Sequence, residues 1–169
     1  VYPMPANVSA ADRPYFIAHR DGGEQRYVSE MFRSRIKNAD IFQYSERRQA
    51  SNGGFDGVIL VAIPPSHFSN FFEQAAGTDN YTTSLVRDDG ELLARFPAPA
   101  GTTKFAPSSQ FMQSIARNPD SGIYNTSQSG IDGIARTVAY RKLPDLPVYV
   151  AVGVASDLVR ETWMYRMGT

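Results

Sequence analysis

The stretch IARTVAYRKLPDLPVYVAVGV, residues 134–154, predicts two antiparallel strands joined by a tight turn. Residues 134–143 and 148–154 have strand composition, and the Pro-Asp-Leu-Pro sequence between them is typical of a turn. In the second strand a valine stands at every other position, from Val148 to Val154. Because successive side chains of a strand point to opposite faces, we expect the valine face to pack against the core.

A second hairpin is predicted upstream of this one. Residues 83–87 and 91–95 flank the sequence Asp-Asp-Gly, in which Gly90 occupies the position that needs a positive φ. The next stretch, residues 97–130, is rich in Pro, Ser, Gly, Asn and Gln, and its helical pattern is confined to residues 109–117. A long irregular stretch inside a compact domain often serves a function.

The N-terminal half predicts its own helices and strands. A short helix is expected from Asp12 to His19, and strands are expected over residues 27–34 and 41–48. The continuous apolar run over residues 57–63 predicts a strand that is buried on both faces. Ser66 is expected to cap the helix that follows.

Two modules follow from this order of elements. The helix after Ser66 ends at Ala76, and the next hairpin begins near Thr82, so we expect a joint near residues 73–80. A last helix is expected from Ser156 to Met167. Strands joined by tight turns, with few helices between them, predict an α+β fold built on antiparallel sheets.

Composition excludes several classes of function. Lys plus Arg equals Asp plus Glu, at 17 each, whereas a nucleic-acid surface needs a basic excess. The absence of cysteine excludes disulfides, thiolate metal sites and cysteine nucleophiles. His19 and His67 have no metal-ligand spacing, and no base–nucleophile pair or cofactor motif is present. We therefore expect no enzyme activity, no metal and no cofactor, and a small periplasmic hydrolase is the weakest hypothesis.

Aromatic and arginine side chains gather in the first half of the sequence. One interpretation is an ordinary core with a solvated basic face. The other is a small-molecule pocket, in which aromatic rings form the walls and an arginine binds a carboxylate through two parallel hydrogen bonds. The residues concerned are Tyr15, Phe16, Tyr27, Phe42, Tyr44, Arg47 and Arg48.

Two groups of motifs follow one another along the chain. The first group is Asp12-Arg13-Pro14-Tyr15-Phe16, Ser45-Glu46-Arg47-Arg48, Gly54-Phe55-Asp56-Gly57-Val58, and Pro65 with Phe68. The second group is residues 89–97, Asp132-Gly133, Arg136, residues 139–141 and residues 147–153. In this order, the first group resembles the membrane-distal half and the second the membrane-proximal half of double Cache sensors, which occur in bacterial histidine kinases and diguanylate cyclases.

The resemblance implies two PAS-like (Cache) modules, each an antiparallel sheet flanked by helices. The distal module would be residues 1–76, the proximal module residues 77–156, and residues 157–169 a helix leading towards the membrane. The long N-terminal helix and first strands of the family pattern have no counterpart before Val1, so we expect a fragment whose distal module lacks them.

The resemblance also implies a function and a setting. The fragment would be the non-catalytic, extracytoplasmic (periplasmic) sensing portion of a bacterial inner-membrane receptor, with a histidine kinase or a diguanylate cyclase as output. The full-length receptor would be a homodimer that meets the membrane through flanking helices outside this chain. The alternative is a ligand-free structural or protein-interaction module of such a receptor.

The distal module is where the resemblance and the aromatic cluster together place a ligand. The expected ligand is a small acidic molecule, and the expected site residues are Tyr15, His19, Tyr27, Phe42, Tyr44, Arg47 and Asp56. The proximal module is expected to hold no tightly bound ligand, because its strands carry aliphatic and small residues.

One choice within this site depends on strand geometry. Tyr44 and Arg47 lie three residues apart, so they share a face only if a bulge near Glu46 shifts the strand. Without a bulge we expect Arg48 to point inward and Arg47 to be a surface charge.

Overall fold

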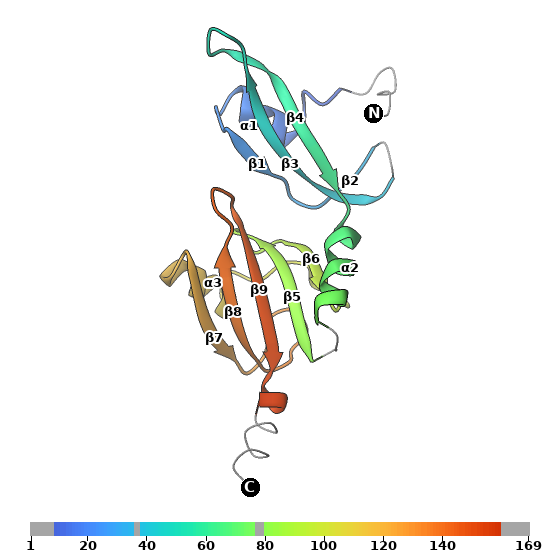
Figure 1. Ribbon diagram of the computed structural model, residues 1–169, viewed down its shortest axis with the longest axis vertical. Helices are drawn as coiled ribbons and strands as arrows, with labels where there is room; N and C mark the ends of the chain where they lie inside the picture. Colours follow the sequence, from blue (N-terminus) through green and yellow to red (C-terminus); the bar gives the residue numbers. More distant parts are fainter. Residues whose placement is uncertain (1–8, 36–37, 77–79, 160–169) are drawn as a thin grey trace, which may run out of the picture. The chain divides into compact units, whose positions relative to one another are not determined.

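The computed structural model describes residues 9–35, 38–76 and 80–159 (Figure 1). Contacts divide the chain into two compact units. Unit 1 holds the chain up to Ser29 together with Gln43–Ile63, and unit 2 holds Glu30–Phe42 and the chain from Pro64 onward. The described strands pair antiparallel in two separate sheets, with a few short helices beside them, which confirms the predicted α+β class.

Unit 1 is a small sheet with one helix. Helix α1 (Pro14–Arg20) packs against β1 (Arg26–Val28) and β4 (Phe55–Ile63). Strand β3 (Asp40–Gln49) lies next to β1 and β4, and pairs antiparallel with β1. The first three residues of β3 belong to unit 2, and the first two of them, Asp40 and Ile41, pair with β2 (Phe32–Arg33).

The apolar strand β4 is not buried on both faces as we expected. Ile59 is 63% exposed and Val61 is 56% exposed. Helix α1 contacts β4, but among the described residues no element covers the side chains of Ile59 and Val61. An apolar run predicts a strand, but it does not say how many faces of that strand are covered.

Unit 2 is built on one five-stranded antiparallel sheet with the order β6-β5-β9-β8-β7 (Figure 1). Its strands are β5 (Tyr81–Arg87), β6 (Leu92–Phe96), β7 (Ser121–Thr126), β8 (Arg136–Lys142) and β9 (Val148–Ala155). Helix α2 (Pro65–Ala76) packs on β6 and β5, and α3 (Gln110–Arg117) packs on β7. The two predicted hairpins are confirmed as β5–β6 and β8–β9.

Two features of the chain differ from those expected: the boundary between the units, and the structure of the stretch over residues 97–130. The unit division falls at Pro64, because α2 packs on the sheet of unit 2 and so joins it, whereas the sequence suggested a joint near residues 73–80. Strand β7 lies inside the stretch that looked irregular. Its composition is polar, it pairs with β8 alone among the described strands, and Ile123 on it is 75% exposed, so its sequence carries no apolar strand pattern.

The core of unit 2 uses the opposite face of β9 from the one predicted. Tyr149 and Ala151 belong to the core cluster, whereas on the valine face Val148 is buried outside that cluster and Val152 is 40% exposed. Phe111 of α3 is almost fully buried and meets Tyr149 and Tyr140 edge to face, at ring-centre distances of 5.9 and 6.1 Å. Tyrosine rings can enter this core because their hydroxyls find backbone acceptors.

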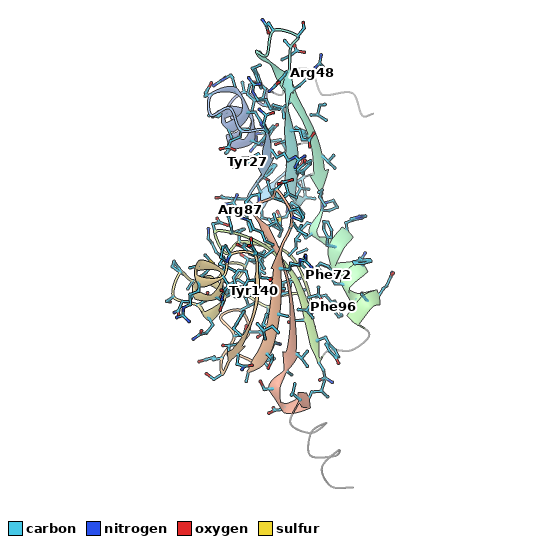
Figure 2. The ribbon with its side chains drawn as sticks, turned by 60° about the vertical axis from the view of Figure 1, so that its left-hand side comes forward. Tyr27, Arg48, Phe72, Arg87, Phe96 and Tyr140 are labelled. Carbon is cyan, nitrogen blue, oxygen red and sulfur yellow. The ribbon has the colours of Figure 1, made fainter. Side chains whose placement is uncertain are left out.

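The acceptors lie at the end of α3 and just beyond it. The Tyr140 hydroxyl, in the residue labelled in Figure 2, donates to the Ser114 or Asn118 carbonyl oxygen, each at 2.8 Å. The Tyr149 hydroxyl donates to the Pro119 carbonyl oxygen, also at 2.8 Å. The hydrogen bonds of these two tyrosine hydroxyls therefore connect the end of α3 and the residues after it to the sheet. Valine side chains could not form such bonds.

The expected C-terminal helix is described only at its beginning. Residues 156–159 are helical, and the remainder of the predicted helix, residues 160–169, lies outside the described residues. Across the described ranges, none of the helices has the length and apolar character needed to span a bilayer.

Gly90 in the β5–β6 turn provides a stability test. It has a φ of 90°, and a Cβ there would lie 2.8 Å from the Phe105 carbonyl oxygen and 3.1 Å from the Met112 sulfur. Gly90→Ala should lower the free energy of unfolding by about 1–3 kcal/mol in denaturant titrations. Gly101→Ala, placed where a Cβ has open space, should change it by less than about 0.5 kcal/mol. Equal effects of the two substitutions would contradict this account.

Asp89 in the same turn makes stability depend on pH. It accepts hydrogen bonds from Arg87 Nε at 2.9 Å and from Lys104 Nζ at 2.9 Å. The bonds from Arg87 hold the pKa of Asp89 well below its ordinary value, against the opposing effect of burial. A carboxyl whose pKa is lower in the folded state adds stability above its unfolded pKa of about 3.9, and this contribution is lost as the pH falls towards the folded pKa.

Asp89→Asn should therefore destabilise unit 2 at pH 7 by about 1–2 kcal/mol, a reduced figure because the carboxylate is partly solvated. The difference from the unsubstituted protein should shrink as the pH falls below about 4. Thermal melts across this range check it, with the exposed neighbour Asp88 replaced by Asn as the control. A gap that stays constant with pH would rule out the Asp89 carboxylate as its source.

Candidate functional site

His19 is the centre of the described part of unit 1. Its side chain is fully buried on the inner face of α1. Its Nδ1 faces the Glu24 carbonyl oxygen at 2.5 Å, and its Nε2 faces the Ser45 hydroxyl of β3 at 2.8 Å. Because a carbonyl oxygen can only accept, Nδ1 carries a proton and donates it to Glu24. The imidazole thus connects α1, the following loop and β3.

Two of the predicted tyrosines lie near the His19 side chain: one shares its face of α1, and the other contacts its ring. Tyr15 precedes His19 by one helical turn and is buried on the same face of α1, and this burial raises the pKa of its phenol. Tyr27 on β1 pairs across the sheet with Ser45, and its ring meets the His19 ring edge to face at 6.3 Å.

Arg47 comes to the same cluster from β3. Its Nε donates to the His19 carbonyl oxygen at 3.1 Å, and its guanidinium lies over the Phe55 ring, 5.6 Å from the ring centre. Its side chain is half-buried. Within the described residues, the two terminal nitrogens of Arg47 have no hydrogen-bond partner or counter-ion.

Arg48 occupies a different environment. It forms an ion pair with Asp56 at 2.8 Å, and its side chain is 61% exposed. Figure 2 labels it near the turn between β3 and β4. Asp56 therefore neutralises Arg48 and does not join the cluster around His19.

The expected bulge is absent from the β1–β3 pairing, whose register runs without interruption from Arg26↔Glu46 to Val28↔Tyr44. Tyr44 therefore faces away from Arg47, and its hydroxyl donates to Glu46. The inference that Arg48 would then point inward was wrong, because the inward residue is Ser45 and not Tyr44. Arg47, two positions further, shares the face of Ser45.

The seven predicted site residues thus divide into two groups. Tyr15, His19, Tyr27 and Arg47 lie in one part of unit 1. Tyr44 and Asp56 lie in the same unit but have other partners. Phe42 belongs to unit 2, where its ring stacks on Phe68 at 6.1 Å.

A group of charges that the sequence reasoning missed lies inside unit 2. Arg95 of β6 and Arg136 of β8 are 6% and 5% exposed, and both bind Asp132, at 2.8 and 2.5 Å. The available signal was strand periodicity, because Arg136 has the same parity as the core residues Val138 and Tyr140. A charged residue at a core position of a strand indicates a buried polar site. The described residues hold no group of three His, Asp or Glu side chains placed to bind a metal.

A family comparison and solved structures relate the chain to known proteins. The profile of the dCache_1-like family, described as histidine kinase sensor domain, matches residues 65–153, more than half of the chain. No curated protein sequence matches it. The extracellular domain of the candidate histidine kinase rpHK1S-Z16 is 30% identical, with a TM-score of 0.76, and the match covers 94% of this chain and 65% of that one.

Two chemoreceptor domains have the same fold at lower identity. They are the ligand-binding domain of Pseudomonas fluorescens CtaA in complex with L-serine, with a TM-score of 0.62 and 18% identity, and that of Pseudomonas aeruginosa PAO1 PctB in complex with L-Arg, with a TM-score of 0.67 and 16% identity. These matches cover 92% and 100% of this chain. The chain spans 65% of the length of each of these three structures, just under two thirds.

The family profile covers most of unit 2, including the whole of β5 to β8 and most of β9. The similarity to the extracellular domain of rpHK1S-Z16 extends over unit 1 as well, since it covers nearly the whole chain. The chain therefore belongs to the dCache_1-like family of histidine kinase sensor domains, which sense signals and are not catalytic.

Proposed function

We propose that this chain is the extracytoplasmic ligand-sensing portion of a bacterial membrane receptor, and that it binds an acidic small molecule through Arg47 in unit 1. The observation that carries the proposal is the state of the Arg47 guanidinium. It is half-buried and held in place, yet its terminal nitrogens have no partner among the described residues.

Arg47 is oriented before any ligand arrives. The His19 carbonyl oxygen holds its Nε, and the Phe55 ring supports the plane of the guanidinium. These contacts leave the two terminal nitrogens of the guanidinium available for a carboxylate, which arginine binds through two parallel hydrogen bonds. Orientation in advance lowers the entropy lost on binding. A partly desolvated cation without a counter-ion is unfavourable, so an anionic ligand would stabilise this arrangement.

The chemoreceptor domains with this fold are in complex with L-serine and L-Arg, and every amino acid carries a carboxylate. An α-carboxylate on Arg47 is consistent with that chemistry. We propose an amino acid or another small carboxylic acid as the ligand, with Tyr15 and Tyr27 close to its binding region. Ligand and output would be connected through α1, because Arg47 Nε binds the carbonyl oxygen of His19 near the end of that helix.

A signal then needs two arrangements of α1, one of which the ligand favours. A carboxylate that binds and shifts the Arg47 guanidinium also changes the hydrogen bond from Arg47 Nε to the His19 carbonyl oxygen. Because the His19 ring is bound to β3 and to the loop after α1, a change at Arg47 would reach all three segments. In the complete receptor we propose two Cache modules, a homodimer, a periplasmic location with flanking membrane helices, and a histidine kinase or a diguanylate cyclase as output.

The alternative function, a ligand-free structural module, is favoured by one observation. Both ring nitrogens of His19 are bonded within the protein, as in an ordinary buried histidine. The two proposals differ in what Arg47 does, since a structural role requires only its Nε bond and its contact with Phe55.

The test is a thermal-shift screen of L-amino acids and small mono- and dicarboxylic acids, followed by calorimetry with each compound that raises the melting temperature. A compound present at about one hundred times its Kd should raise the melting temperature by on the order of 5–10 °C. Arg47→Ala should abolish the binding of that compound. Arg48→Ala, which removes a solvated ion pair on the same strand, should change the binding free energy by less than about 1 kcal/mol.

Three outcomes would reject the Arg47 site. If Arg48→Ala abolished binding and Arg47→Ala did not, the ligand would lie on the outer face of β3. If neither substitution had an effect, arginine would not hold the ligand in unit 1. If no acid in the panel bound at all, the ligand-free module would be the better description of the domain.

A further inference from the structure

A second place where a small molecule could bind lies wholly within unit 2. It is a cavity of about 30 Å³ that is lined by the sheet, by the loops after β6 and β7, and by the first residues of α3. This volume is enough for roughly two water molecules. Its polar lining includes Arg95, Arg136 and Tyr124. Its apolar lining includes Phe105, Phe111 and Val138.

The charges around this cavity do not balance. Arg95 and Arg136 are both almost fully buried, and one carboxylate, that of Asp132, binds both of them. Two positive charges and one negative charge leave a net charge of one positive unit. Burial lowers the pKa of Arg95, and the nearby carboxylate of Asp132 only partly opposes this. An anion in the cavity would complete the neutralisation.

Two hydrogen-bond donors that line this cavity lack a partner among the described residues. Arg136 Nε is buried, and it has no hydrogen-bond partner among the described residues. Buried donors without a partner are rare, and each one calls for an explanation. The Tyr124 hydroxyl also makes no hydrogen bond within the described part of the chain, and burial raises its pKa to about 12. At neutral pH the phenol therefore keeps its proton and can donate it.

The rest of the lining restricts the ligand further. Ser109 and Gln110 bring the N-terminal turn of α3 to the cavity, and the partial positive charge of a helix N-terminus favours an anion. The Phe105 and Phe111 rings face each other at 4.8 Å and give an apolar wall. A ligand that suits both sides has a carboxylate and a very short aliphatic tail.

We propose that unit 2 has its own binding site for a short aliphatic carboxylate of the acetate class, held by Arg95 and Arg136 with Tyr124 as an additional donor. The sequence had predicted no ligand in this half, because the valine-rich strands suggested few convergent polar groups. The structure brings those groups together from β6, β7 and β8, which lie far apart in the sequence. This site is separate from the one proposed at Arg47.

Calorimetry with sodium formate, acetate, propionate and butyrate, in buffers matched with sodium chloride, tests the proposal on the whole chain. Acetate should bind with one-to-one stoichiometry, and butyrate should bind at least about tenfold more weakly because the cavity cannot hold its tail. Arg136→Met should abolish acetate binding. Arg141→Met is the matched control, because Arg141 lies on the same strand with its side chain exposed, and this variant should bind acetate normally.

Circular dichroism shows whether Arg136→Met still folds. If it does not, Tyr124→Phe serves as the test, because it removes one hydroxyl and should weaken acetate binding several-fold without unfolding unit 2. Absence of acetate binding by the unsubstituted chain overturns the proposal. Full acetate binding by a folded Arg136→Met variant also overturns it. Where Arg136→Met is unfolded, full acetate binding by Tyr124→Phe does the same. Equal binding of chloride and acetate likewise overturns the proposal. Arg47→Ala should leave acetate binding intact, so failure at one site is distinguishable from failure at the other.

Discussion

Arginine stays charged at any pH that a protein meets, so a fold that withdraws arginine from water must surround it with acceptors. Arg95 and Arg136 share Asp132 inside unit 2, and Arg87 is held by Asp89 and Glu30 beside the β5–β6 turn. Asp132 lies 37 positions from Arg95 and four from Arg136, and Glu30 lies 57 positions from Arg87. The positions of these guanidinium groups therefore depend on the sheet being correctly paired, and the polar chemistry of the domain depends on them.

At each of the two places where we propose a ligand, an arginine has nitrogens without a partner among the described residues. At Arg47 the missing partners are those of the terminal nitrogens, while in the cavity of unit 2 the missing partner is that of Arg136 Nε. The two differ in degree of burial, since Arg47 is half-buried and Arg136 almost fully buried. A half-buried site suits a ligand that exchanges with solvent, whereas a small cavity lined by buried side chains suits a very small one.

The sequence predicted the fold class, both hairpins of unit 2 and helices close to α1, α2 and α3, because each of these leaves a local signal. It did not predict which face of β9 joins the core, because burial of the Tyr149 hydroxyl is favourable only when the Pro119 carbonyl oxygen is near enough to accept its hydrogen bond. Four of the seven proposed site residues come together. Of the other three, Tyr44 faces away because Ser45 is the inward residue, Phe42 packs in unit 2, and Asp56 pairs with Arg48. The pairing of Arg95 with Asp132 joins residues 37 positions apart, and no local pattern predicts it.

The central claim is that Arg47 is the group in unit 1 that meets the ligand. Side-chain NMR of arginine Nε–H groups, recorded during a titration with the acid that gives the largest thermal shift, tests it most directly. If Arg47 binds the acid, its Nε–H resonance should move and saturate with the ligand while the Arg48 resonance stays in place. A titration in which the Arg47 resonance stays still while the acid binds would contradict it.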